Sequence, residues 1–153
     1  MLFIGISAMI IVKVYGGLGN QLFQYATAYA LSERTNSPLI LDAQYYKKNK
    51  LRSFELKHFN IKGEEYSKKK HGIPIDKGIN SFFTKIYAKI NKINTVVRFN
   101  EKFFHYDSSF KNIEKNTYLD GYWQSENYFK PYQKDLESIL TPIDKLSKVH
   151  EPI

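Results

Sequence analysis

The first part of the chain alternates short apolar runs with one longer helical pattern. Residues 9–15 are β-branched and apolar over the length of a buried strand. After a glycine-rich turn over residues 16–20, apolar residues recur at helical spacing from Gln21 to about Asn36, where Asn36-Ser37-Pro38 stops the helix. Residues 38–42 predict a second short strand. This order predicts a βαβ unit, and therefore a parallel sheet.

The pattern is looser in the rest of the chain. Residues 45–50 and 63–72 are polar and predict loops, whereas residues 51–61 are partly apolar without a defined type. Residues 95–99 and 117–121 predict two more strands, and a helix is expected from Ser125 as its N-cap to about Leu140. No closing strand is predicted over 144–153. The expected fold class is α/β, with helices flanking a parallel sheet.

Residues 78–93 predict an amphipathic helix whose apolar positions share one face. In soluble proteins such a face usually packs on the protein's own core, and we expect this here. Because Lys85, Lys89 and Lys92 lie elsewhere around the helix, a helix resting on a membrane surface is the alternative.

The charge of the chain concentrates in its middle third. The formal net charge is +8, and residues 51–100 hold 11 basic residues against 4 acidic ones. A basic module that binds anionic lipid or RNA is therefore the alternative function. Only three of the 23 basic residues are Arg, the residue that reads bases by bidentate contacts, so nucleic acid is not the expected partner.

Several kinds of chemistry are excluded by composition. The chain has no Cys, which excludes disulfides, thiolate metal sites and Cys nucleophiles. Its four His residues show no metal-ligand spacing, so no metal site is expected. The apolar residues 1–12 are too short to span a bilayer and lack a basic leader region. We expect Met9 to be the natural start, residues 1–8 to be an upstream extension, and residues 9–153 to form one lobe.

The turn Gly16-Gly-Leu-Gly-Asn-Gln21 lies between a predicted strand and a predicted helix. Free backbone N–H groups and the positive end of a helix meet at such a point, which suits a phosphate. The spacing matches neither the dinucleotide-binding fingerprint nor the P-loop. A tight turn that needs glycine only for its backbone angles is the structural alternative.

A second motif, Asp120-Gly-Tyr-Trp-Gln-Ser125, follows the predicted strand 117–121. Tyr122 and Trp123 offer flat apolar faces, and Gln124 and Ser125 offer hydrogen-bond donors and acceptors. This mixture suits a sugar or a base. A Trp buried at a strand–helix junction is the alternative.

Taken together, residues 9–26 (MIIVKVYGGLGNQLFQYA) and 118–129 (YLDGYWQSENYF) resemble the N-terminal portion of bacterial α-1,2-fucosyltransferases, glycosyltransferase family 11. Leu41-Asp42 and residues 54–61 also resemble that family, whereas residues 64–98 match nothing specific. The resemblance implies the Rossmann-like N-terminal, acceptor-side lobe of a two-lobed GT-B enzyme. Such enzymes transfer L-fucose from GDP-β-L-fucose to the 2-hydroxyl of a galactose in a glycan, without a metal or other cofactor.

The resemblance also implies site residues. The donor cleft would be lined by the first motif, at Gly17, Leu18, Gly19, Asn20 and Gln21. Sugar contacts would come from the second, at Tyr122, Trp123, Gln124 and Ser125. A base must deprotonate the acceptor hydroxyl, and the nearby carboxylates are Asp42, Asp120 and Glu126, among which the sequence does not choose.

One family feature is absent. The family's His-x-Arg-Arg-x-Asp motif, which opens the second lobe and grips GDP, has no counterpart, and no Arg follows Arg98. We therefore expect the donor lobe to be missing and this chain alone to be an inactive fragment. The resemblance implies a cytoplasmic location, with peripheral contact to the inner face of the cell membrane left open.

Overall fold

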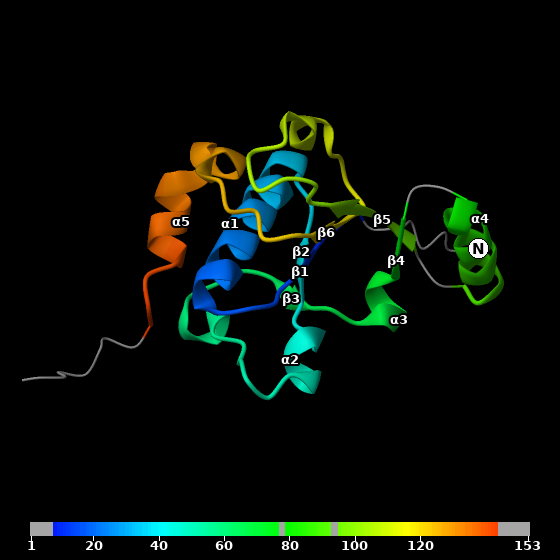
Figure 1. The fold of residues 1–153 in the computed structure, drawn as a ribbon, viewed down its shortest axis with the longest axis horizontal. Coiled ribbons are helices and arrows are strands. Elements are labelled where there is room, and N and C mark those ends of the chain that lie inside the picture. The colour runs from blue at the N-terminus through cyan, green and yellow to red at the C-terminus, as the bar shows by residue number, and fades with distance from the viewer. Residues whose placement is uncertain (1–7, 77–78, 93–94, 144–153) are drawn as a thin grey trace, which may run out of the picture.

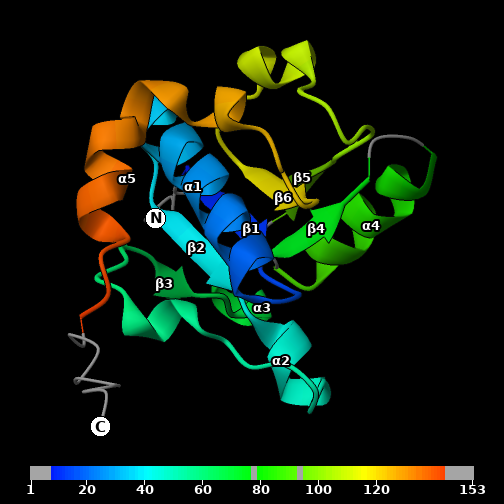
Figure 2. The ribbon, with the colours of Figure 1, turned by 60° about the vertical axis from the view of Figure 1, so that its left-hand side comes forward.

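A computed structural model describes residues 8–76, 79–92 and 95–143. The predicted extension at residues 1–8, apart from Ala8, and the prediction for residues 144–153 lie outside the described residues. The chain has an α/β fold whose six-stranded sheet has the order β3-β2-β1-β6-β5-β4, with every neighbouring pair parallel (Figures 1 and 2). The strands are β1 (Ile10–Lys13), β2 (Leu39–Asp42), β3 (Glu64–Glu65), β4 (Ile73–Ile75), β5 (Thr95–Asn100) and β6 (Thr117–Asp120). The helices are α1 (Leu18–Thr35), α2 (Gln44–Lys48), α3 (Lys68–His71), α4 (Ile79–Ile90) and α5 (Gln133–Ile139).

The strand order decides which loops become neighbours. In the common doubly wound sheet the fourth strand lies beside the first. Here the chain crosses from β3 to the far edge, forms β4, and returns through β5 to β6, which pairs with β1. The loops that follow β1 and β6 therefore emerge side by side at the carboxyl edge of the sheet.

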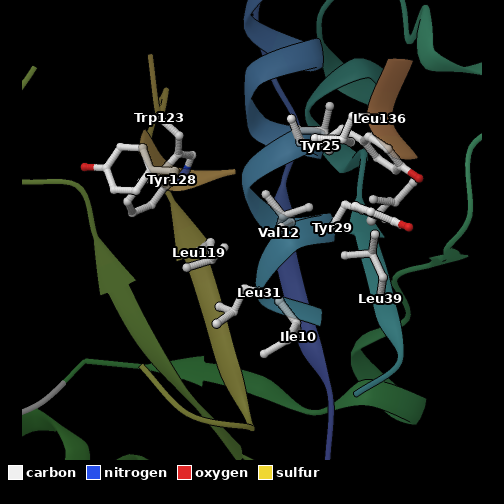
Figure 3. Packing of buried hydrophobic residues seen from close by; sticks show 14 of the residues in the cluster. Ile10, Val12, Tyr25, Tyr29, Leu31, Leu39, Leu119, Trp123, Tyr128 and Leu136 are labelled. Atoms are coloured by element: carbon white, nitrogen blue, oxygen red, sulfur yellow. The ribbon is translucent and has the colours of Figure 1, made fainter. Parts of the chain in front are cut away.

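The main core lies between α1 and one face of the sheet (Figure 3). Ile10, Val12 and Leu119 project from the central strands toward the buried face of α1, where Tyr25 and Leu31 are fully or almost fully buried. Leu136 of α5 and Tyr128 close the cluster on either side. Burial of this apolar surface is the main stabilising contribution that fixes α1 against β1.

The helix predicted from Gln21 begins three residues earlier, at Leu18, because the glycine-rich turn enters directly into the first helical turn. It ends where predicted, with Asn36 in the left-handed conformation as its C-cap. The predicted strands at the centre of the sheet are all confirmed.

Three other predictions were wrong. Residues 45–50 were expected as a loop, but most of them belong to α2, and residues 63–72 contain β3 and α3. Strand β4 was not predicted at all, since three residues around Pro74 give no periodic signal. The helix expected from Ser125 is instead two 3-10 turns, at Glu126–Tyr128 and Lys130–Tyr132, followed by α5. Pro131 lacks the N–H that a continuous helix would need there.

The helix predicted at 78–93 exists as α4, but its expected packing is wrong. Among its residues whose burial is described, Ala88 is the buried apolar one, and it lies against Ile73 and Ile75 of β4. Its large apolar side chains at Phe82, Phe83, Ile86, Tyr87 and Ile90 are exposed. No helix among the described residues is long and apolar enough to cross a membrane.

Candidate functional site

The structure joins the two motifs that the sequence singled out. The first follows β1 and opens α1, and the second follows β6, the strand next to β1. The side-chain amide of Gln124 donates a hydrogen bond of 2.8 Å to the side-chain oxygen of Asn20. The carboxyl ends of parallel strands are where α/β proteins bind their ligands, so this junction is the candidate site.

The buried side chain of Gln24 links the two motif loops by hydrogen bonds. Gln24 accepts a hydrogen bond of 3.0 Å from the Tyr15 backbone N–H and donates one of 3.2 Å to the Gly121 carbonyl. Its side chain has no exposed surface. Gln24 belongs to the resembling string, but no site role was predicted for it, because its bonding partners lie beyond local sequence.

The glycine-rich turn presents unpaired backbone donors. Helix α1 has no side-chain N-cap, and no acceptor in the described part of the chain bonds the N–H groups of Leu18, Gly19 and Asn20. Gly16 requires glycine, because its φ is +84° and a Cβ there would lie 2.7 Å from Asn20 Nδ2. At Gly19, by contrast, an added Cβ would meet nothing within 4 Å, so the fold itself does not require glycine there.

Gln21 is buried and hydrogen-bonded within the fold, and it also lines the hollow beside Gly17 and Arg52. Its side chain donates to the carbonyls of Gly16 and Ser53 and accepts from the Glu55 N–H. These bonds fasten the segment around Ser53 to the glycine-rich turn. The structure thus gives Gln21 a positioning role.

The bonds of Gln21 to the segment around Ser53 place Arg52 beside the glycine-rich turn. Arg52 was not among the site residues predicted from the sequence. The guanidinium of exposed Arg52 lies so close to Gly17 that a Cβ on Gly17 would approach Arg52 Nη1 to 3.2 Å. A hollow of about 490 Å³ is lined by both residues and by Leu18 and Lys50. No local signal pointed to Arg52, since it lies in a polar loop more than 30 residues after the motif. Arg and Lys beside free backbone N–H groups suit an anionic group such as a diphosphate.

The second motif is held in shape by Glu101. Its carboxylate accepts hydrogen bonds from the N–H groups of Tyr122 (2.7 Å) and Trp123 (3.0 Å). Gly121 must be glycine, because a Cβ there would lie 2.4 Å from Glu101 Cβ. Trp123 has a φ of +58°, a conformation that bulky residues rarely adopt and that these bonds help to hold.

The predicted sugar contacts divide into two groups. Tyr122 and Gln124 are exposed, and Ser125 is half-buried. Trp123 has no exposed surface and stacks on Phe99 in the core, with ring centroids 6.0 Å apart. Trp123 therefore follows the alternative of a buried Trp at the end of a strand.

The three candidate carboxylates lie in different settings. Asp120 forms ion pairs with Lys13 (3.1 Å) and Arg98 (2.8 Å). It also lines a hollow together with Tyr15 and Tyr122. Asp42 is buried and accepts a 2.7 Å hydrogen bond from the Tyr118 hydroxyl. Glu126 is exposed and lies 3.8 Å from Lys130. Of the three, Asp120 alone borders a hollow beside the second motif, which Tyr15 at the end of β1 also lines.

That hollow, of about 400 Å³, opens at the ends of β1, β5 and β6. Its walls include Tyr15 and Tyr122, whose rings lie 5.0 Å apart, and the exposed rings of Phe103 and Phe104. Burial, and next the charge of Asp120, raise the pKa of the Tyr15 hydroxyl, so it is neutral and can donate a hydrogen bond at neutral pH. Aromatic faces beside a carboxylate and a hydroxyl suit a sugar.

A third hollow, of about 430 Å³, lies beyond Tyr46 and is lined mainly by apolar side chains such as Leu41, Phe54 and Ile61. It contains neither motif, so we do not assign it to the site. Within the residues that the structure describes, no three His, Asp or Glu side chains come together as metal ligands.

Comparison with known proteins gives two relatives, both from Escherichia coli. The chain is 33% identical over 141 residues to an alpha-1,2-colitosyltransferase, covering 90% of this chain and 46% of the relative. It is 33% identical over 121 residues to the O-antigen biosynthesis glycosyltransferase WbnK, covering 71% of this chain and 40% of that relative. This chain is a relative of bacterial glycosyltransferases.

These relatives confirm the resemblance of the two motifs to bacterial glycosyltransferases. One of the two relatives is named for α-1,2 transfer. The chain spans less than half the length of either of these relatives. No family model matches the chain. No solved structure matches it either.

Proposed function

We propose that this chain is the acceptor-side lobe of an inverting α-1,2-glycosyltransferase with the two-lobed GT-B architecture. In the whole enzyme, L-fucose would pass from GDP-β-L-fucose to the 2-hydroxyl of a galactose in a glycan. The observation that carries the proposal is the Gln124–Asn20 hydrogen bond, which unites both family-like strings at the carboxyl ends of β1 and β6.

The proposed chemistry assigns a task to each side of the junction. The unpaired N–H groups of Leu18 and Gly19, with the Arg52 guanidinium, would stabilise charge on the leaving diphosphate. Tyr122 and the polar atoms of Asp120 would orient the acceptor sugar in the neighbouring hollow. Asp120 is the carboxylate we favour as general base, because it borders that hollow.

A second donor is favoured by one relative's name. Colitose is L-fucose without its 3-hydroxyl, and the chain is 33% identical to an enzyme named for colitose transfer. A colitose-transferring enzyme would use the same inverting mechanism at the same junction. The two donors differ by one hydroxyl, so a direct comparison of donors separates them.

The test uses two polypeptides: the 153-residue chain, and an extended chain in which it is joined to the part of the colitosyltransferase that it does not match. With lactose as acceptor, we expect the 153-residue chain to be inactive and the extended chain to form an α-1,2-linked product from GDP-fucose. Turnover by the 153-residue chain alone would refute the proposal that it is incomplete. Failure of the extended chain with both GDP-fucose and GDP-colitose would refute the proposed transferase lobe. The donor that the extended chain prefers reports on the joined part, because that part supplies the donor lobe.

A further inference from the structure

The side chains of α4 are arranged the opposite way from those of an ordinary surface helix. Ala88 faces the sheet, packed on Ile73 and Ile75. Successive residues turn by about 100° around a helix, so Ile86 and Ile90 lie nearly opposite Ala88. Both point into solvent, and Ile90 is 74% exposed. An amphipathic helix normally buries its apolar face.

The exposed face is continuous along the helix. Phe82, Phe83, Ile86, Tyr87 and Ile90 share one side and are between 41% and 74% exposed; we call these five residues the α4 apolar face. The rings of Phe82 and Phe83 touch each other, with centroids 5.7 Å apart. A contiguous apolar surface of this kind on a soluble domain marks a site of interaction with another molecule.

A row of positive charge borders that face. Lys85 and Lys89 are exposed along one side of it, and Lys92 follows just after the helix. None of the three forms an ion pair with a described residue, and residues 79–92 contain no Asp or Glu. The partner must therefore offer an apolar interior together with negative charge at its surface.

We propose that α4 lies in the plane of an anionic lipid bilayer, with its apolar face among the upper acyl chains. Helices that bind in this way combine Phe and Leu-like residues on one face with Lys on the other. The lysine stems can extend along the apolar surface while their ammonium groups reach lipid phosphates. At about 18 Å, α4 is too short to span the bilayer.

The observations favour a bilayer over two other occupants. A second copy meeting α4 by two-fold symmetry would add another set of lysines to the interface, and the helix has no acidic residue to pair with them. RNA would satisfy the lysines but would leave the isoleucines of the α4 apolar face without apolar contact. Figures 1 and 2 both place α4 at the opposite end of the molecule from α5, beside the edge strand β4 and clear of the main core.

The test is co-sedimentation of the 153-residue chain with vesicles of phosphatidylcholine alone and of equal parts phosphatidylcholine and phosphatidylglycerol. We expect binding to the anionic vesicles at low and physiological salt, weakened by added salt. The double variant Phe83→Ser/Ile90→Ser should lower the affinity for anionic vesicles by about tenfold or more, because two inserted apolar side chains are lost. The charge variant Lys85→Glu/Lys89→Glu should also lower the affinity for anionic vesicles by about tenfold or more, because the new carboxylates are repelled by the anionic lipid headgroups.

Leu51→Ser is the matched control, since it removes an apolar side chain that is 91% exposed elsewhere, and it should bind as the wild type does. Circular dichroism checks that every variant keeps its helical content. Tyr87→Trp adds a reporter whose fluorescence should shift to the blue on anionic vesicles and be quenched by brominated acyl chains, whereas Trp123 stays in the core.

Three results would overturn the proposal. The first is no binding to anionic vesicles, and the second is equal binding by the Phe83→Ser/Ile90→Ser variant. The third is a wild-type chain that dimerises through the α4 apolar face and does not sediment with the vesicles. Loss of vesicle binding in the extended chain would overturn it too, because the added part would then cover α4. None of these readouts requires sugar transfer, so the outcome is independent of the proposed function.

Discussion

Asn20 and Gln124 are 104 residues apart in the chain, yet their side-chain amides meet at 2.8 Å. The Asn20 oxygen accepts this bond, and no hydrogen bond from Asn20 Nδ2 is found among the described residues. The bond therefore fixes the orientation of the Asn20 amide, with its Nδ2 beside Gly16 at the start of α1.

Asn20→Ala in the extended chain should reduce kcat/KM for GDP-fucose by about tenfold to a hundredfold, because one oriented donor to the nucleotide sugar is lost. Gln124→Ala is the control: it keeps the Asn20 amide but removes its orientation, and a smaller loss is expected. Initial-rate kinetics with varied donor measure both. Unchanged kcat and donor KM in Asn20→Ala would mean that the glycine-rich turn is only structural.

Gln24→Leu should destabilise the fold by about 2 kcal/mol, since it leaves the Tyr15 N–H and the Gly121 carbonyl without their partner. Urea unfolding of the 153-residue chain measures the loss. Gln124→Ala, which removes only an exposed side-chain pair, should change the unfolding free energy by less than about 0.5 kcal/mol. Equal effects of the two substitutions would contradict a special role for Gln24.

Gly19→Ala should separate stability from binding. An added Cβ meets nothing and the helix gains a better former, so the unfolding free energy should rise by about 0.5 to 1 kcal/mol. In the extended chain the same methyl group would lie in the path of the leaving diphosphate, and the donor KM should increase. Gly16→Ala should instead destabilise the chain, because of the φ of +84°. A Gly19→Ala variant with normal donor KM would argue against diphosphate binding at this turn.

Stability should fall at alkaline pH through buried tyrosines. Burial raises the pKa of Tyr25 and of Tyr66 to about 12, from an ordinary value of 10.0. Both hydroxyls stay protonated in the fold while the unfolded chain releases protons above pH 10, so the unfolding free energy should decrease from pH 10 to about pH 12. Urea unfolding across that range measures this. Tyr25→Phe should flatten the decline, although it also loses the 2.9 Å bond from the Lys62 N–H; an unchanged slope would contradict the assignment.

The sequence by itself determined the central elements of the fold. The apolar strand before Gly16, the helical spacing after it and the stop at Asn36-Ser37-Pro38 are local signals, and all three are found at the expected places. The two motifs could also be recognised without a structure, because each is a contiguous string with its own backbone requirement, such as the positive φ of Gly16.

Only the tertiary structure decided how those pieces face one another. Strand pairing brings β6 beside β1, and so places Gln124 on Asn20, because hydrogen bonding between distant strands leaves no trace in local periodicity. Burial likewise separates Trp123 from Tyr122, although they are adjacent in one motif. The same holds for α4: its spacing showed an apolar face, but only packing through Ala88 on β4 decided that this face points outward.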